Sequence, residues 1–142
     1  MENELYQEEC GACHFPYQPG LLPEQSWKKL FETTQLADHF GDSAELDENV
    51  RQKLLEYAVN HSADKSYYKR SRKIMAFLNE NEVPLRITET DYFKEKHEEI
   101  PDNLISKNPK VKSLSFCNKC HKKADEGIYD DDTVFIPGHG RW

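Results

Sequence analysis

The sequence contains no long hydrophobic run. No stretch reaches the roughly 18 consecutive apolar residues that a membrane-spanning helix needs, so we expect no transmembrane segment. The chain begins Met1-Glu2-Asn3-Glu4, which is acidic rather than basic and then apolar, so we also expect no signal peptide in it. No basic patch is interleaved with aromatic side chains, and we therefore predict no nucleic-acid partner.

Hydrophobic residues are also scarce. They make up 37% of the 142 residues, while charged residues make up 32%. This length suits one ordinary domain or two small ones. A core built from these side chains alone would be thin, so we expect a bound apolar group to contribute to it.

Cysteine is rare and is confined to two short strings. All 4 cysteines fall in Cys10-Gly11-Ala12-Cys13-His14 and Cys117-Asn118-Lys119-Cys120-His121. Both strings read Cys-x-x-Cys-His, the pattern of c-type haem attachment. Two cysteines on one turn each form a thioether with a haem vinyl group, and the histidine that follows is held against the iron. We predict two haem c groups, with thioethers at Cys10, Cys13, Cys117 and Cys120 and proximal ligands at His14 and His121.

Cysteine pairs of this kind have two other common uses. Zinc ribbons place their pairs roughly 15–20 residues apart, whereas residues 14–116 separate these two pairs. A thioredoxin-like pair follows a strand in a βαβ unit, but the residues before Cys10 indicate an acidic helix. Neither alternative explains a histidine directly after both pairs, although the residues before Cys117 are too few to decide.

The sixth iron ligand must come from elsewhere in the chain. The main candidates are His39, His61, His97, His139 and Met75, with Met1 as a weak one. We favour His39, which has apolar neighbours in an expected short helix, and His97, which shares a helix face with Phe93. His139, between two glycines, is the rival to His97. Two histidines on one iron lower its reduction potential relative to a methionine–histidine pair.

The charge of the chain is unevenly distributed. The net charge is −7; residues 1–60 carry 12 acidic and 4 basic side chains, and residues 61–142 carry 14 and 15. Such asymmetry suits electrostatic steering of a docking partner. Solvated helix faces explain it equally well.

The hydrophobic pattern predicts a mainly α fold. Expected helices cover about residues 3–13 and 35–40, and others begin at Pro23 and Asp47. Ile74, Phe77 and Leu78 mark another helical face, and Thr90 is expected to cap a helix that runs through His97 and stops near Pro101. We expect an extended segment over 83–90, a loop-like end over 125–142 and a short strand at 134–136. A boundary near Ser62-Ala63-Asp64 would divide the chain into an N-terminal haem domain, 1–63, and a less regular C-terminal haem domain, 64–142.

Several segments resemble the bacterial dihaem cytochrome c family. They include Pro19–Pro23, Asp38–Asp42 and Pro84–Thr90, together with His97–Pro101 and the two Cys-x-x-Cys-His strings. The resemblance implies a small cytochrome c-like N-terminal domain and bis-histidine ligation, with His39 and His97 as distal ligands. It also implies a periplasmic electron carrier that, in some bacteria, donates to a small oxygen-binding monohaem cytochrome.

We therefore expect an electron-transfer protein rather than an enzyme, in a mature form whose export signal has been removed. An iron with two protein ligands has no open position for a substrate. The alternative is a haem enzyme or gas-binding protein, which would need one open coordination position. That alternative gains weight if His39 or His97 is not a ligand.

Overall fold

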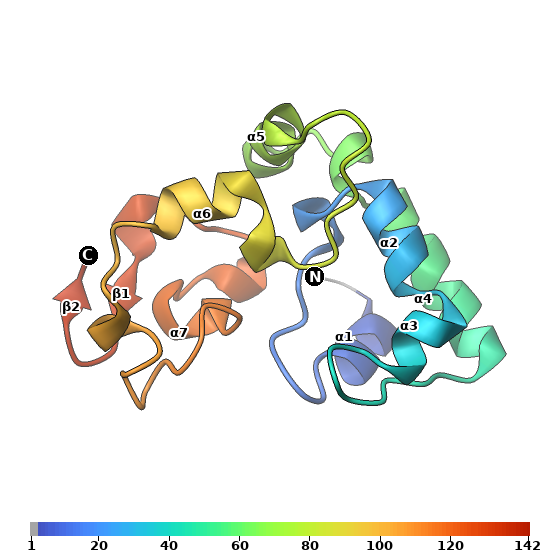
Figure 1. The fold of residues 1–142 in the computed structure, drawn as a ribbon, viewed down its shortest axis with the longest axis horizontal. Helices are drawn as coiled ribbons and strands as arrows, with labels where there is room; N and C mark the ends of the chain where they lie inside the picture. The colour runs from blue at the N-terminus through green and yellow to red at the C-terminus, as the bar shows by residue number, and fades with distance from the viewer. Residues whose placement is uncertain (1–2) are drawn as a thin grey trace. The chain divides into compact units, whose positions relative to one another are not determined.

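The computed structural model describes residues 3–142, so the candidate ligand Met1 lies outside the described residues. The fold is mainly helical, as predicted (Figure 1). The α-helices are α1 (Glu4–Cys10), α2 (Glu24–Leu30), α3 (Thr33–Ala37), α4 (Glu48–Asn60), α5 (Lys69–Phe77), α6 (Asp91–His97) and α7 (Cys117–Cys120). The 3-10 helices are Pro19–Leu21, Ala63–Lys65, Ile87–Glu89, Asp102–Leu104, Ala124–Glu126 and Asp131–Thr133. Among the described helices, none has the length and apolar character to cross a membrane.

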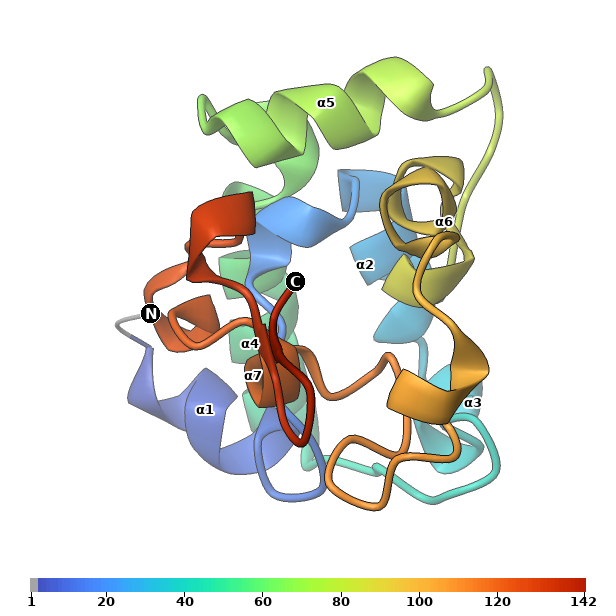
Figure 2. The same ribbon diagram turned by 90° about the vertical axis from the view of Figure 1, so that its left-hand side faces the viewer.

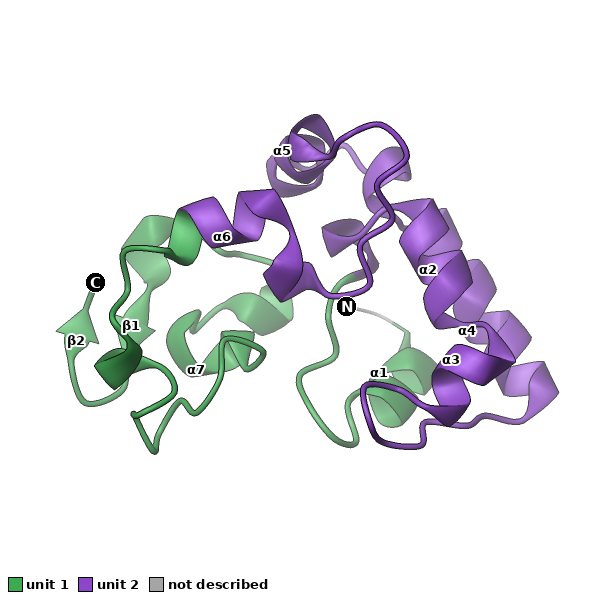
Figure 3. Cartoon of the chain, viewed as in Figure 1, with its two compact units in different colours: residues 1–18, 96–142 green, residues 19–95 purple. Residues whose placement is uncertain are grey.

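The chain divides into two compact units (Figure 3). Unit 1 joins the residues up to 18 with residues 96–142, and unit 2 is residues 19–95. Both Cys-x-x-Cys-His strings therefore belong to unit 1. This division by packing differs from the expected boundary near residue 63. The assignment of one haem each to 1–63 and 64–142 stays a prediction.

The core of unit 2 forms where α2 packs against α4. Trp27 and Leu30 of α2 are buried, and Leu54 and Ala58 of α4 are 0% exposed. These positions recur every three or four residues, which places them on one face of each helix. The indole Nε1 of Trp27 donates to the carbonyl of Pro19 at 2.8 Å, so this buried polar group is satisfied.

Helix α5 contacts the first part of α6 through two side chains. Arg70 of α5 donates to the hydroxyl of Tyr92 at 2.6 Å, and the ring of Phe77 meets the ring of Tyr92 edge-on. The predicted N-cap at Thr90 is confirmed, because its Oγ1 accepts from the backbone N–H of Phe93 at 3.4 Å. The first part of α6 thus packs within unit 2, and its last residue, His97, belongs to unit 1.

Unit 1 is less regular. The buried side chains Tyr6, Val111, Ala124 and Ile136 come from widely separated parts of the sequence. The predicted short strand is confirmed as β1 (Phe135–Ile136), which pairs antiparallel with β2 (Gly140–Arg141) at the C-terminus (Figure 2).

Three predicted elements differ from the structure. The helix expected to reach Cys13 ends at Cys10, and the expected extended segment 83–90 contains the 3-10 helix Ile87–Glu89. The helix expected over 35–40 is Thr33–Ala37, because a tight turn follows it. In that turn the N–H of His39 donates to the carbonyl of Asp42 at 2.7 Å, and Gly41 takes a φ of 96°. His39 therefore lies on a turn and not on a helix.

Candidate haem sites

The first string lies where α1 ends. Cys10 is the last residue of α1, and the N–H of Gly11 donates to the carbonyl of Gln7 at 2.9 Å. A Cβ on Gly11 would lie 2.3 Å from that carbonyl oxygen, so only glycine fits this turn. Burial, with the charge of Glu9 second, raises the pKa of Cys10 to about 12.

His14 is oriented by its own neighbours. Its Nδ1 lies 2.8 Å from the carbonyl of Phe15, and a carbonyl can only accept, so Nδ1 carries the proton. The lone pair of a neutral imidazole is then on Nε2. A hydrogen bond of this kind usually orients a metal-ligating histidine and raises its basicity. The donor chemistry of the first string therefore fits an iron porphyrin attached at Cys10 and Cys13.

The second string forms a helical turn of its own. Cys117 and Cys120 begin and end α7, and residues three apart lie on the same face of a helix. His121 follows directly, and its N–H donates to the carbonyl of Cys117 at 2.8 Å. Burial raises the pKa of Cys117 to about 11 and also raises that of Cys120. Two sulfurs on one face and an adjacent imidazole match what haem attachment needs.

The structure brings His97 and His121 together. Their ring centres are 6.2 Å apart and their planes are inclined by 69°. A metal–imidazole bond is about 2.0 Å, and ring bonds of about 1.33 Å put the ring centre about 1.1 Å behind the bonding nitrogen. Two imidazoles on opposite sides of one ion therefore have centres about 6 Å apart. The separation of His97 and His121 is compatible with ligation of one iron by both residues.

His39 is placed differently. It is half-buried on its turn in unit 2, with its ring 4.8 Å from the ring of Phe40. The guanidinium of Arg86 lies 4.2 Å from the centre of the Phe40 ring. The structure thus places His39, within unit 2, beside the ring of Phe40, and it is this ring that contacts Arg86. Its pairing with His14, which belongs to unit 1, stays a prediction.

The other candidate ligands occupy less suitable places. His61 is exposed at the end of α4, where its Nδ1 donates to the carbonyl of Tyr57 at 2.9 Å. His139 is exposed in the turn between β1 and β2, with its ring 5.7 Å from that of Trp142. Met75 is half-buried on α5.

Zinc would require a different arrangement. Within residues 3–142, no three side chains of His, Cys, Asp or Glu are grouped so that they could hold a metal ion. Haem iron needs only axial ligands from the protein, because the porphyrin supplies the other bonds. The pair of His97 and His121 would satisfy that smaller requirement for one haem.

The sequence did not point to the residues that link the two strings within unit 1. Tyr17 donates its phenol proton to the carbonyl of Ser115 at 2.6 Å, and Gln18 donates from Nε2 to the carbonyl of Ala124 at 2.5 Å. Burial, with the Cys117 sulfur second, raises the pKa of Tyr17 to about 12, so the phenol stays a donor. Only their nearness to His14 could have drawn attention to these two residues.

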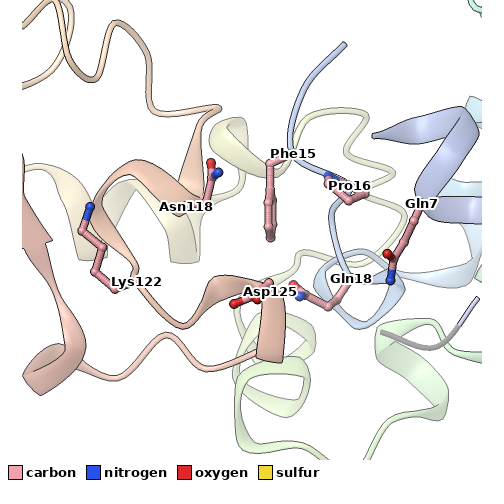
Figure 4. A pocket seen from close by; sticks show the side chains of 7 residues that line it. All are labelled: Gln7, Phe15, Pro16, Gln18, Asn118, Lys122 and Asp125. Atoms are coloured by element: carbon pink, nitrogen blue, oxygen red, sulfur yellow. The ribbon is translucent and has the colours of Figure 1, made fainter. Parts of the chain in front are cut away.

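A cavity of about 390 Å³ lies beside this link. Its lining is Gln7, Phe15, Pro16, Gln18, Asn118, Lys122 and Asp125, with the ring of Phe15 pointing into it (Figure 4). The lining combines residues next to the first string with residues of and after the second. Neighbourhoods of the two strings thus share one surface within unit 1.

The comparisons with known proteins agree on one family. The family model for dihaem cytochrome c matches residues 6–129. A dihaem cytochrome c of Shewanella baltica is 41% identical with a TM-score of 0.80, covering 100% of this chain and 98% of that one. A dihaem cytochrome c of Rhodobacter sphaeroides is 36% identical with a TM-score of 0.79, covering 91% of this chain and 98% of that one. No curated protein sequence matches the chain.

Proposed function

Because the chain belongs to the dihaem cytochrome c family, we propose that it is a periplasmic electron carrier whose two irons are each ligated by two histidines. The family carries two c-type haems with iron, and the chain supplies one Cys-x-x-Cys-His string for each. When bound, each haem supplies a one-electron iron couple. The protein supplies attachment, axial ligands and distance.

The pair of His97 and His121 carries this proposal. A ring separation of 6.2 Å suits two imidazoles on one iron. His97 is the last residue of α6, His121 directly follows α7, and both belong to unit 1. Two strong axial ligands leave no open position for oxygen or a substrate. A site closed in this way exchanges electrons and does not bind a reactant.

For the other iron we propose His14 and His39. The Nδ1–H of His14 donates to Phe15, which supports coordination through Nε2. The tight turn at Gly41 holds the backbone of His39 by its hydrogen bond with Asp42. A ligand on a constrained turn loses little further backbone freedom when it binds, which favours coordination.

Electron transfer by this family implies a redox partner protein. We propose a small oxygen-binding monohaem cytochrome as the acceptor. The acidic balance of residues 1–60 suits long-range steering toward a basic surface, an effect that salt weakens. Haem attachment outside the bacterial cytoplasm places both proteins in the periplasm.

Carbon monoxide tests the proposed function against a gas-binding protein or a haem enzyme. The purified protein is reduced with dithionite, and visible spectra are recorded before and after carbon monoxide is added. We expect unchanged spectra at both haems, because both irons keep two histidines. Rapid formation of a carbon monoxide complex at either haem would show that this iron has an open coordination position, and it would contradict the proposed function as an electron carrier.

A further inference from the structure

The segment after the first string holds the second string from both sides. Tyr17 bonds to the carbonyl of Ser115, two residues before Cys117, at 2.6 Å. Gln18, the next residue, bonds to the carbonyl of Ala124, three residues after His121, at 2.5 Å. Two adjacent residues therefore bind the backbone on either side of α7.

Tyr17 is also fixed to the first string. Its ring stacks on the imidazole of His14, with centres 5.0 Å apart and planes inclined by 29°. The ring of Phe15 meets the Tyr17 ring edge-on, with ring centres 5.8 Å apart. The carbonyl of Tyr17 accepts a hydrogen bond from the hydroxyl of Tyr6, a buried residue of α1, at 2.5 Å. Movement of Tyr17 would therefore move the surroundings of His14.

Gln18 is connected to the other proximal histidine. Its Oε1 accepts a hydrogen bond from the hydroxyl of Tyr129. The ring of Tyr129 meets the ring of His121 edge-on, with centres 5.2 Å apart. Tyr17, which stacks on His14, is therefore joined by one peptide bond to Gln18, which is hydrogen-bonded to the tyrosine that contacts His121.

We infer that Tyr17 and Gln18 act together as positioning residues that set the separation of the two haem-attachment strings and so the rate of electron exchange between the haems. The inference rests on the proposed electron-transfer function and deepens it. Tyr17 and Gln18 act through His14, His121 and the backbone of the second string.

Two substitutions remove these bonds with little change of shape. Tyr17→Phe keeps the aromatic ring stacked on His14 and loses the hydrogen bond to the carbonyl of Ser115. Gln18→Met keeps the length of the side chain and loses both hydrogen bonds of the Gln18 amide. Tyr92→Phe is the matched control, since it removes a buried phenol that is bonded to Arg70 within unit 2. Proton NMR of the haem methyl groups in half-reduced protein gives the rate of exchange between the haems. A redox titration gives the separation of their potentials.

We expect both variants to retain two covalently attached haems, as measured by mass spectrometry, and to show low-spin spectra. The exchange rate should fall by about threefold to tenfold, because electron exchange depends on how closely and how constantly the two haems are held together. Tyr92→Phe should exchange at the wild-type rate. If the exchange rate and the separation of potentials match the wild type in both variants, the inference is wrong.

A third variant covers the case in which Gln18→Met fails to hold its haems. Tyr129→Phe removes only the hydroxyl that bonds Gln18, and we expect a smaller fall in exchange rate in the same direction. An unchanged rate in both Tyr17→Phe and Tyr129→Phe overturns the inference. Carbon monoxide binding by the wild type would instead overturn the proposed function, so the two failures are distinguishable.

Discussion

The imidazole rings of His97 and His121 lie 6.2 Å apart, centre to centre, at the ends of two helices that are distant in the sequence. His121 follows the second cysteine pair directly, where a haem attached at that pair would bring the iron to it. His97 is the last residue of α6, and its ring lies beside that of His121 within unit 1. This arrangement supports the proposal that the two histidines ligate one iron.

His97→Ala tests this pair. We expect one of the two haems to lose its sixth protein ligand, to become high-spin, and to bind carbon monoxide when reduced, because no second imidazole remains. Visible and electron paramagnetic resonance spectra measure the change. His139→Ala is the control and should leave both haems low-spin. If His97→Ala stays six-coordinate and His139→Ala does not, His139 is the ligand.

His39→Ala tests the other iron. We expect it to open the haem attached at Cys10 and Cys13 and to leave the second haem unchanged. His61→Ala is the matched control, since His61 is exposed and bonds only its own helix through Nδ1. Loss of the low-spin signal at the second haem would instead show that the distal ligands are exchanged between the haems.

The haem-free chain should be poorly folded. Only 37% of its residues are hydrophobic, so the porphyrin faces supply apolar surface that the side chains lack. Groups that bind only the folded state stabilise it, as structural metals do. The expected result is weaker helical circular dichroism than in the holoprotein and no cooperative thermal transition. A haem-free chain that melts cooperatively at the holoprotein temperature would show that the protein core is sufficient.

Leu54→Ala should destabilise the folded protein. Leu54 is 0% exposed at the packing of α2 on α4, and truncating a buried leucine costs about 2–5 kcal/mol of the free energy of unfolding. Denaturant unfolding followed by circular dichroism gives the value. Tyr67→Ala, at a side chain 95% exposed, should change it by less than about 0.5 kcal/mol. Equal losses in the two variants would contradict the assigned core.

Short-range features of the fold could be predicted from the sequence. The N-cap at Thr90 and the strand near Phe135 depend on local residue types, and both are present. The turn at His39 was missed because the end of α3 depends on the backbone bond between His39 and Asp42. The packing of the first segment of the chain with the last could not be predicted, since it depends on contacts such as Tyr17 with Ser115.

In the candidate site, too, the motif could be predicted from the sequence, whereas the residues that depend on distant contacts could not. The Cys-x-x-Cys-His spacing is itself a motif, so the prediction of haem attachment at Cys10, Cys13, Cys117 and Cys120 needs no structure. A distal ligand has no fixed spacing, and the preference for His97 over His139 gained support only from ring geometry. Tyr17 and Gln18 carry no motif, because their roles arise from backbone carbonyls that any sequence provides.

The central claim is that both irons are closed by two histidines. Near-infrared magnetic circular dichroism of the fully oxidised wild-type protein tests it most directly, because the charge-transfer band of low-spin ferric haem depends on the axial ligand pair. With two histidines on each iron, all of the haem should show the bis-histidine band. A methionine–histidine band, or a high-spin fraction equal to one of the two haems, would contradict it.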